Sequence, residues 1–481
     1  MVFPVVGGTQ DTGAYEIDNS LRFNDGDSAR LTLDPGTSTN NKKCTLSFWA
    51  KIGVPTSNGT DYFFSNHADA NNRCRVHISN TGEFAIFGKS SGSTFIDLYT
   101  NARYRDSSAW YHFLVRVDST DGTANNRLKL YVNGTLQTDV TQGTNPDQNA
   151  DVILGSQDNM TIGAGHSGSA ANSNPYDGYL AEMHFLDGTA YDASYFGEFN
   201  DNGVWIPKKY TGGNYGTNGF YMEFKQTGTS ANSSGIGADT SGNDNHFTPT
   251  NLAATDVTTD TPTNNFITWN ALNHTGASLQ EGNTFTETRN SSDYDAGAMG
   301  NIGLTRGKWY WELKITAVGS HTYAGIINIG NRFDMADEDY DTTSGGTDGY
   351  PIYDYMELGK RGSNTGSGRS ETGVVQATYG DGDILNFALD LDNNKIHYGK
   401  NGTYGESSDP ANNTNGIAIS DGVYYTPVVV GYGNGDIHAN FGQPAFSISS
   451  GNADANGHGN FEYAPPSGFF SICTKNLAET G

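Results

Sequence analysis

Cysteine and positive charge are both scarce in this chain of 481 residues. Its three cysteines, Cys44, Cys74 and Cys473, are odd in number and widely spaced, without a C-x-x-C motif or a histidine cluster. They therefore predict neither a disulfide framework nor a zinc site, and we expect buried free thiols. The 27 lysines and arginines stand against 53 aspartates and glutamates. Because so negative a surface repels phosphate backbones and anionic headgroups, nucleic acid is not an expected partner.

Long apolar runs and targeting signals are also missing. No segment approaches the ~20 apolar residues of a membrane helix, so we expect no membrane insertion. The N-terminus MVFPVVGGTQ has no basic n-region and no apolar stretch of signal-peptide length, which predicts synthesis in a cytoplasm without an export signal. A composition rich in Asn, Ser and Thr then explains the Asn-x-Ser/Thr triplets without glycosylation. Examples of those triplets begin at Asn58, Asn133, Asn273 and Asn401.

Glycine and aromatic residues are abundant instead. The chain has 62 Gly, 27 Tyr and 24 Phe, which is typical of antiparallel strands joined by tight turns. The length allows two domains, each with its own core. In WYHFLVRV, residues 110–117, strict alternation places four side chains on one predicted core face. They are Tyr111, Phe113, Val115 and Val117.

The same alternation recurs in three other segments. In GYLAEMHFLDG, residues 178–188, it predicts Tyr179, Ala181, Met183 and Phe185 in the core. In GKWYWELKI, residues 307–315, it predicts Trp309, Trp311, Leu313 and Ile315 in a thick core between sheets. In DILNFALDL it predicts Leu385, Phe387, Leu389 and Leu391. Residues 251–265 lack periodicity and contain Pro262, which favours a domain boundary there.

Two segments share a hairpin pattern. A predicted strand at Leu128 to Val132 runs into Asn133-Gly134, and another at Lys395 to Tyr398 is followed by Asn401-Gly402. Asn-Gly supplies the positive φ angles that tight hairpin turns need. Each segment therefore predicts a strand, a turn and a returning strand.

The motifs resemble two known families. Trp110-Tyr111-His112, Tyr131 to Gly134 and Gly178 to Phe185 resemble a concanavalin A-like domain of the LamG type across residues 15–200. GKWYWELKI, LNFALDLDNNKIHYGKNG, YYTPVVVGYG and HANFG resemble a SPRY domain across residues 264–445. The resemblance implies an all-β chain with two antiparallel, jelly-roll-like β-sandwich domains in series. The predicted parts are an arm at 1–14, a LamG-like domain at 15–210, a connector with one or two strands at 211–263, a SPRY-like domain at 264–448 and a tail at 449–481 that packs on it.

This combination, with the connector ending in DTPTNNF and the tail FEYAPPSGFFSICTKNL, is similar to tail-fibre and other virion proteins of marine bacteriophages. The resemblance implies a virion structural protein, assembled in the host cytoplasm, that attaches to a host-surface glycan or protein without catalysis. It implies other virion proteins as partners and a homo-oligomer, most simply a trimer. The chain has no heptad segment, so an oligomer would form through the sandwich faces or the arm.

Two other functions stay open. One is a purely structural virion component, such as a capsid decoration or tail attachment protein. The other is a glycan depolymerase, which needs two carboxylates at a fixed separation, often as E-x-D-x-x-E. Glu16 and Asp18 begin that pattern, but Leu21 stands where the second glutamate belongs, and G-x-S-x-G, H-E-x-x-H and P-loop motifs are absent. We therefore predict no catalytic residues and interpret Glu182 as a structural carboxylate.

Calcium is the metal that the loops could hold, since Ca²⁺ takes 6–8 oxygen ligands. DSTDGTANN at 118–126 and DMADEDYD at 334–341 are rich in such oxygens. The alternative is that these side chains cap their own turns, and the sequence does not separate the two interpretations. No cofactor is otherwise expected.

The long acidic, Tyr-rich segment between Gly330 and Asp381 carries the predicted ligand site. Aromatic faces stack on sugar rings and carboxylates accept hydroxyl hydrogen bonds, which suits a glycan. The same mixture suits a flat protein interface or packing of the loop against its own sandwich. The candidate contact residues are Asp339, Tyr340, Asp341, Asp348, Tyr350, Tyr353, Asp354 and Tyr355.

Overall fold

The computed structural model confirms the predicted all-β class. Among the described residues the paired strands are antiparallel, except that Phe470–Ser471 pairs in parallel with the strand Lys308–Ala317. It describes residues 15–54, 59–155, 159–167, 170–288, 296–319, 321–330, 352–356, 360–364, 369–374 and 378–481. The predicted arm at 1–14 lies outside them. The chain divides between Thr263 and Asn264 into two compact units, called here the N-terminal and the C-terminal unit.

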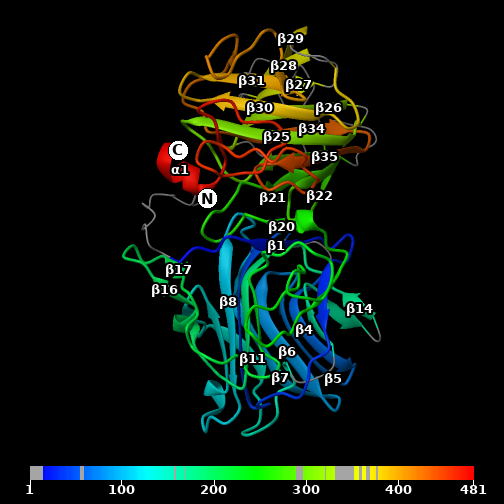
Figure 1. The fold of residues 1–481 in the computed structure, drawn as a ribbon, viewed down its shortest axis with the longest axis vertical. Helices are drawn as coiled ribbons and strands as arrows, with labels where there is room; N and C mark the ends of the chain where they lie inside the picture. The colour runs from blue at the N-terminus through cyan, green and yellow to red at the C-terminus, as the bar shows by residue number, and fades with distance from the viewer. Residues whose placement is uncertain are drawn as a thin grey trace. The chain divides into compact units, whose positions relative to one another are not determined.

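The N-terminal unit is a sandwich of two sheets (Figure 1). The first sheet, called sheet A, runs in the order β10-β9-β8-β3-β15-β1-β20, and β18 also pairs with β15. Its strands are β1 (Ser20–Phe23), β3 (Lys43–Ile52), β8 (Trp110–Asp118), β9 (Leu128–Val132), β10 (Thr135–Leu136), β15 (Gly178–Asp187), β18 (Phe220–Met222) and β20 (Val257–Thr258).

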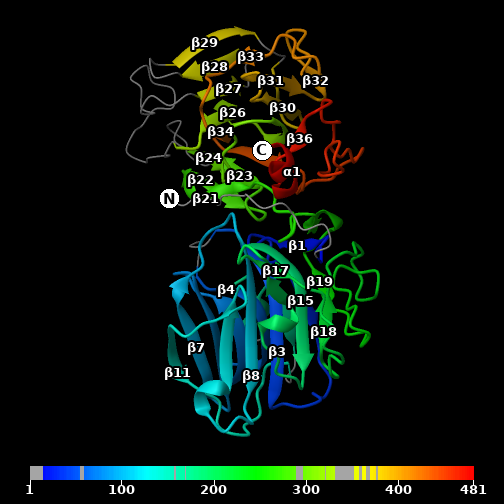
Figure 2. The same ribbon diagram turned by 90° about the vertical axis from the view of Figure 1, so that its left-hand side faces the viewer.

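The second sheet, called sheet B, runs in the order β11-β7-β6-β5-β4-β12-β2-β19. Its strands are β2 (Arg30–Leu33), β4 (Asp61–Asp69), β5 (Asn72–Ile78), β6 (Glu83–Ser90), β7 (Ser93–Arg103), β11 (Val140–Thr144), β12 (Met160–Ile162) and β19 (Thr248–Thr250). Figure 2 shows β4, β7 and β11 in one layer and β3 and β15 in the other. Residues 211–263, predicted as a connector, thus supply β18, β19 and β20 to the two sheets.

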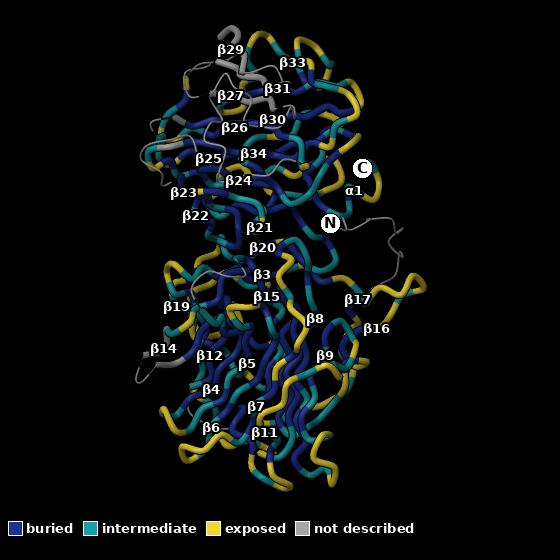
Figure 3. Tube along the Cα trace, turned by 180° about the vertical axis from the view of Figure 1, so that it is seen from behind, coloured by how far each residue is buried: buried dark blue, intermediate teal, exposed yellow. Residues whose placement is uncertain are grey.

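Short elements join these strands. They are the hairpins β13 (Gly165–Ser167) with β14 (Ala170–Ser173) and β16 (Gly197–Phe199) with β17 (Trp205–Pro207), and the 3₁₀ turns η1 (Ala124–Asn126), η2 (Ala193–Tyr195) and η3 (Ala254–Asp256). Figure 3 shows buried residues along the strands and exposed residues mainly in the turns between them.

The core between the two sheets confirms the alternation predicted for β8. Phe113, Val115 and Val117 are buried in it and Tyr111 packs against it. The alternation predicted for β15 is half wrong. Met183 and Phe185 face this core, but Tyr179 and Ala181 belong to another cluster on the outer side of sheet A.

The cause is a bulge in β15. Its register against β3 shifts by one residue between Ala181 and His184, and Glu182 has a φ of 48°. An extra residue in one strand moves every later side chain to the opposite face. Simple alternation therefore fails at Glu182.

The C-terminal unit also has two sheets. One runs β21-β24-β34-β26-β27-β28-β29, with β21 (Trp269–Thr275), β24 (Ala296–Gly300), β26 (His321–Asn328), β27 (Ile352–Met356), β28 (Lys360–Asn364), β29 (Arg369–Val374) and β34 (Tyr425–Tyr432). The other runs β22-β23-β35-β25-β30-β31-β32, with β33 on β31 and β36 on β25. Its strands are β22 (Ala277–Gln280), β23 (Phe285–Thr288), β25 (Lys308–Ala317), β30 (Ile384–Asp390), β31 (Lys395–Lys400), β32 (Thr403–Tyr404), β33 (Ile417–Ala418), β35 (Gly435–Asn440) and β36 (Phe470–Ser471), and helix α1 (Thr474–Thr480) ends the unit.

Both faces of β25 are buried. Trp309, Trp311, Leu313 and Ile315 are fully buried, as the alternation predicts. The Glu312 carboxylate on the other face is buried too, and it accepts hydrogen bonds from the backbone N–H groups of Glu462 and Tyr463 at 3.0 and 2.8 Å. The chain near residue 460 therefore covers the face of β25 that alternation leaves polar.

The two predicted hairpins are confirmed. Asn133 and Gly134 have φ of 45° and 75°, and Asn401 and Gly402 have φ of 49° and 77°. The Asn133 Oδ1 accepts from the N–H of His112 at 2.8 Å, and the Asn401 Oδ1 accepts from that of Ile384 at 2.9 Å. Each asparagine thus closes its turn and also ties it to the neighbouring strand.

The three cysteines are buried and free, as predicted. Among the described residues, no helix is long and apolar enough to span a membrane.

A buried ion pair ties residues 251–263 to sheet A. Lys51 on β3 lies 2.8 Å from the Asp260 carboxylate, both side chains are almost fully buried, and the Trp110 indole donates to Asp260 at 3.1 Å. Burial lowers the pKa of Lys51, and Asp260 opposes that shift. Removing one partner of such a pair leaves the other charge buried and uncompensated.

Replacing Asp260 by alanine should therefore lower the free energy of unfolding by about 3–5 kcal/mol. The double variant Lys51→Met/Asp260→Leu should recover most of that loss, because no charge is left buried. Urea unfolding of the full chain, followed by circular dichroism, measures both. The control is Asp151→Ala, which removes the exposed ion pair with Lys42 and should change little. If Asp260→Ala and Asp151→Ala lowered the free energy of unfolding by the same amount, the role of the buried ion pair would be contradicted.

Candidate ligand-binding face of sheet B

The predicted ligand residues fall in two groups. Asp339, Tyr340, Asp341, Asp348 and Tyr350 lie outside the described residues. Tyr353, Asp354 and Tyr355 lie on β27, where they pair with Ile326, Gly325 and Ala324 of β26. For these three the predicted loop is wrong, because the alternating, tyrosine-rich run IYDYM forms a strand of the sheet.

The carboxylates of the first predicted calcium segment cap their own turn. Asp118 accepts from the N–H and hydroxyl of Thr120 at 3.1 and 2.5 Å and pairs with Lys43 at 3.2 Å. Asp121 accepts from the N–H of Thr123 at 2.8 Å. The second segment, residues 334–341, lies outside the described residues. Within the described residues, no three His, Cys, Asp or Glu side chains gather as metal ligands would.

Glu182 is held in a buried hydrogen-bond network. Its Oε1 accepts from the hydroxyls of Tyr15 at 2.7 Å and Tyr221 at 2.5 Å, and its Oε2 lies 3.2 Å from His184 Nε2. Burial alone would raise the pKa of this carboxyl, but His184 and the two hydroxyls outweigh it and hold the pKa below its ordinary value. Both carboxylate oxygens of Glu182 are thus hydrogen-bonded at the bulge of β15.

The outer face of sheet B, called here the open face, carries three cations without an ion pair among the described residues. On β5 and β6, Arg73, Arg75 and Lys89 alternate with core residues such as Cys74 and therefore point away from the core. Arg73 and Lys89 are direct cross-strand partners. None of the three cations forms an ion pair within the part of the chain that the structure describes.

This arrangement costs stability. Like charges directly opposite each other on neighbouring strands repel. Acidic residues that could neutralise such cations are abundant in the composition of this chain, which has 53 of them. Burial and the same positive charges lower the pKa values of the neighbouring histidines. Burial, followed by the charge of Arg75, lowers the pKa of His77 to about 3, and burial and Arg73 lower the pKa of His67.

Two aromatic rings hold the Arg75 guanidinium. Its central carbon lies 5.1 Å from the ring centre of Tyr62 and 4.7 Å from that of Phe87, and Nη1 donates to the Tyr62 hydroxyl. Cation–π contacts of this kind fix a guanidinium plane without neutralising its charge. The buried Nε of Arg75 has no hydrogen-bond partner among the described residues. The two rings and the Tyr62 hydroxyl therefore orient the guanidinium without neutralising its charge.

Aromatic and acidic side chains lie beside Arg75 on the same face. Phe87 pairs across the strands with Arg75 on one side and Asp97 on the other, and the half-exposed Tyr99 lies one row away, opposite Ala85. Arginine donors match the geometry of carboxylate and sulfate groups, while the aromatic rings offer apolar faces to sugar C–H groups. Three cations and two aromatic rings thus lie together on this face, with the Asp97 carboxylate near Arg75.

Sequence reasoning did not find this face. The available indication was the run NRCRVHI, residues 72–78, where Arg73, Arg75 and His77 alternate with apolar residues in a chain poor in basic residues. The neighbours of those side chains come from β4, β6 and β7 and become known only with the strand register.

Comparison with known proteins agrees with the sandwich of the N-terminal unit. A family model described as the concanavalin A-like lectin/glucanases superfamily matches residues 25–193. No curated protein matches the chain.

Several solved structures are similar to parts of the chain. A SAP-like pentraxin from Limulus polyphemus is 16% identical over 37% of this chain and 80% of its own, with a TM-score of 0.29. The SPRY domain of human HERC1 is 15% identical over 36% of this chain and 96% of its own, with a TM-score of 0.27. The CBM40 of a Ruminococcus gnavus sialidase, bound to sialyllactose, is 17% identical over 32% of this chain and 79% of its own, with a TM-score of 0.24. These are partial likenesses of fold.

The Glu182 network predicts a pH dependence of stability. Because the folded pKa of Glu182 lies below its unfolded value, the network stabilises the fold above the ordinary glutamate pKa of about 4.3 and loses this contribution as the pH falls through the folded pKa. Glu182→Gln should lower the free energy of unfolding at pH 7 by about 1.5–3 kcal/mol. The gap between variant and wild type should narrow as urea unfolding is repeated at decreasing pH. A gap that stays constant from pH 7 to pH 3 would contradict this role.

Proposed function

We propose that this chain is a non-catalytic glycan-binding protein that holds an acidic polysaccharide, carrying carboxylate or sulfate groups, on the open face of sheet B. The observation that carries the proposal is a set of three cations beside aromatic rings on one face, Arg73, Arg75 and Lys89, which form no ion pair among the described residues. An anionic ligand would offset the repulsion between Arg73 and Lys89, which face each other. Tyr62 and Phe87 orient Arg75 before the ligand arrives, so little conformational entropy is lost on binding.

The net charge of −26 does not oppose this role at contact distance. Screening reduces the interaction of exposed charges beyond about 8 Å at physiological ionic strength and beyond about 3 Å at 1 M. In seawater-like salt the distant carboxylates therefore contribute little, while direct guanidinium contacts persist. Binding should be short-ranged and should depend on the geometry of the site.

The biological setting that we propose is a bacteriophage particle, in which the chain acts as a tail-fibre adhesin at the host surface. Several copies on one particle, in a homo-oligomer such as a trimer, would raise a weak single-site affinity to a useful avidity. The resemblance of the motifs to phage virion proteins supports this setting. A purely structural virion role and a depolymerase are the outcomes that would replace it.

The test is binding of the purified chain to a polyuronate and a sulfated polysaccharide, with neutral dextran as the negative control. Replacing Arg75 by glutamine should weaken binding roughly 10- to 100-fold, since a hydrogen bond to a charged group contributes about 1.5–3 kcal/mol. Lys89→Ala should weaken it less, because lysine acts as a point charge. Surface plasmon resonance at several salt concentrations measures both effects.

The matched control is Lys129→Ala. Lys129 lies on β9 in sheet A, and like Lys89 it is half-buried and has no ion pair within the described residues. Binding that is equal for dextran and the acidic polymers, or lost equally in Lys89→Ala and Lys129→Ala, would overturn the proposal. Release of reducing ends from the polymer would replace it with a depolymerase.

A further inference from the structure

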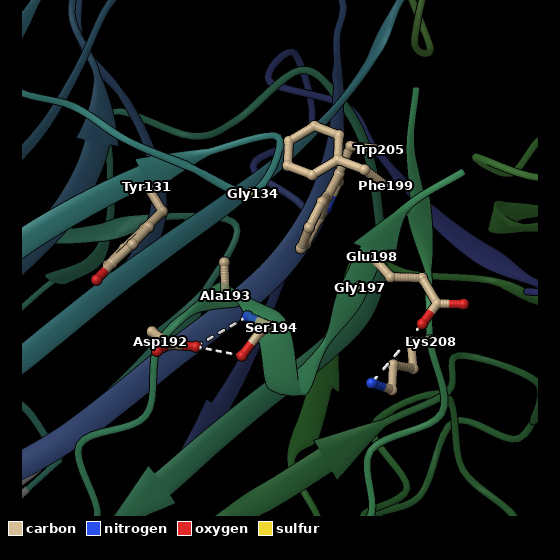
Figure 4. Close-up of a pocket in the computed structure, with 10 residues that line it drawn as sticks. All are labelled: Tyr131, Gly134, Asp192, Ala193, Ser194, Gly197, Glu198, Phe199, Trp205 and Lys208. Carbon is tan, nitrogen blue, oxygen red and sulfur yellow. Dashed lines mark hydrogen bonds and ion pairs between the residues drawn. The ribbon is translucent and has the colours of Figure 1, made fainter. Parts of the chain in front are cut away.

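A hollow of about 440 Å³ lies beside sheet A, against the strand β9, the turn η2 and the hairpin β16–β17. Its wall includes Tyr131, Asp192, Ser194, Glu198, Phe199 and Trp205. Figure 4 shows the Tyr131 ring on one side, the Phe199 and Trp205 rings on another, and Asp192 and Ser194 between them. Pockets that hold small ligands have volumes of about 300–1,000 Å³, so this hollow has room for a mono- or disaccharide.

Two glycines fix the Trp205 ring in the wall. A Cβ on Gly134 would come within 2.2 Å of this ring, and a Cβ on Gly197 within 2.4 Å. Any larger residue at either position would displace the indole, and Gly134 also needs its positive φ for the hairpin turn. The His112 ring lies 5.7 Å away, centre to centre. The indole is therefore held on more than one side.

Phe199 extends this wall into solvent. Its side chain is 54% exposed, and its ring lies 5.0 Å from that of Trp205 at 66°. The two rings form a corner in which Trp205 is packed against its neighbours and Phe199 is exposed. An exposed aromatic beside a fixed one suits the C–H face of a pyranose ring.

Polar groups surround these rings. The Asp192 Oδ1 accepts from the N–H and the hydroxyl of Ser194 at 3.0 and 2.6 Å, which leaves Oδ2 without a partner among the described residues. Trp205 Nε1 is buried and has no hydrogen-bond partner among the described residues either. A hydroxyl can donate to the first group and accept from the second. One face of a sugar could therefore stack while its edge is hydrogen-bonded.

Charge favours a neutral ligand here. Glu198 and Lys208 form an exposed ion pair at 3.7 Å, and Asp192 adds a carboxylate without a cationic partner among the described residues. An anionic sugar would be repelled by Asp192. This is the opposite preference to that of the open face of sheet B.

We propose that this hollow is a second carbohydrate subsite, specific for a neutral pyranose. It is independent of the acidic-glycan site, because different residues form it and because it favours a neutral sugar where the other site favours an acidic one. A chain with both sites would bind a polysaccharide in which acidic and neutral sugars occur together more tightly than either component alone.

The experiment is saturation-transfer NMR of the full chain with four methyl pyranosides, those of glucose, galactose, mannose and N-acetylglucosamine. At least one should bind with a Kd on the order of 1 mM, as expected of a ligand with few atoms. Phe199→Ala should weaken that binding about 5-fold or more, since one stacking face is lost. Glu198→Gln, which preserves side-chain size, should shift the affinity without abolishing it.

The matched control is Tyr195→Ala. Tyr195 is an exposed aromatic of η2, 40% exposed, that stacks on Tyr191 outside the hollow, so pyranoside binding should be unchanged. Arg75→Gln should also leave it unchanged, which separates this subsite from the acidic-glycan site even if the latter fails its own test. Circular dichroism checks the fold of each variant.

Three results would overturn the proposal. The first is that no pyranoside binds. The second is that Phe199→Ala binds the pyranoside as tightly as the wild type does. The third is that Tyr195→Ala and Phe199→Ala lose the same amount of pyranoside affinity. If no sugar binds and Phe199→Ala instead reduces the molar mass measured by light scattering, the hollow is an interface between copies of the chain.

Discussion

The alternation of side chains along β5 is the constraint on which the binding face depends. Cys74, Val76 and Ile78 are buried in the core of the N-terminal unit, so the backbone must direct Arg73 and Arg75 outward. Their position is thus fixed by the burial of their neighbours. Pairing with β4 and β6 then brings Tyr62 and Phe87 to Arg75. The same hydrophobic core that stabilises the sandwich therefore positions the guanidinium groups.

Parts of the fold could be predicted from sequence because their causes are local. The Asn-Gly turns at residues 133 and 401 depend on two residues each, and the core faces of β8 and β25 depend on a few alternating residues. The bulge at Glu182 has no such local cause. Its positive φ is held by Tyr15, Tyr221 and His184, and two of these lie far from it in the sequence. Alternation alone therefore misplaced Tyr179 and Ala181.

The same distinction applies to the site. The sequence directed attention to the acidic, Tyr-rich segment after Gly330, because aromatic and acidic residues are adjacent there in the chain. The binding face of sheet B is assembled instead from strands that meet through register, and its important property is that Arg73 and Lys89 form no ion pair among the described residues. Absence of a partner cannot be seen in a sequence. Asp260 shows the same limitation, since it lies in an aperiodic tract and yet pairs with Lys51, 209 residues earlier.

The most direct test of the central claim is NMR of the arginine Nε–Hε groups of the full chain during titration with a triuronate. The account predicts that the signals of Arg73 and Arg75, assigned by loss in Arg73→Lys and Arg75→Lys, shift with one common saturation curve. A neutral trisaccharide of the same length should leave them unchanged. If both signals stay in place while the triuronate binds, or move equally with the neutral sugar, the open face of sheet B is not the site of acidic-glycan recognition.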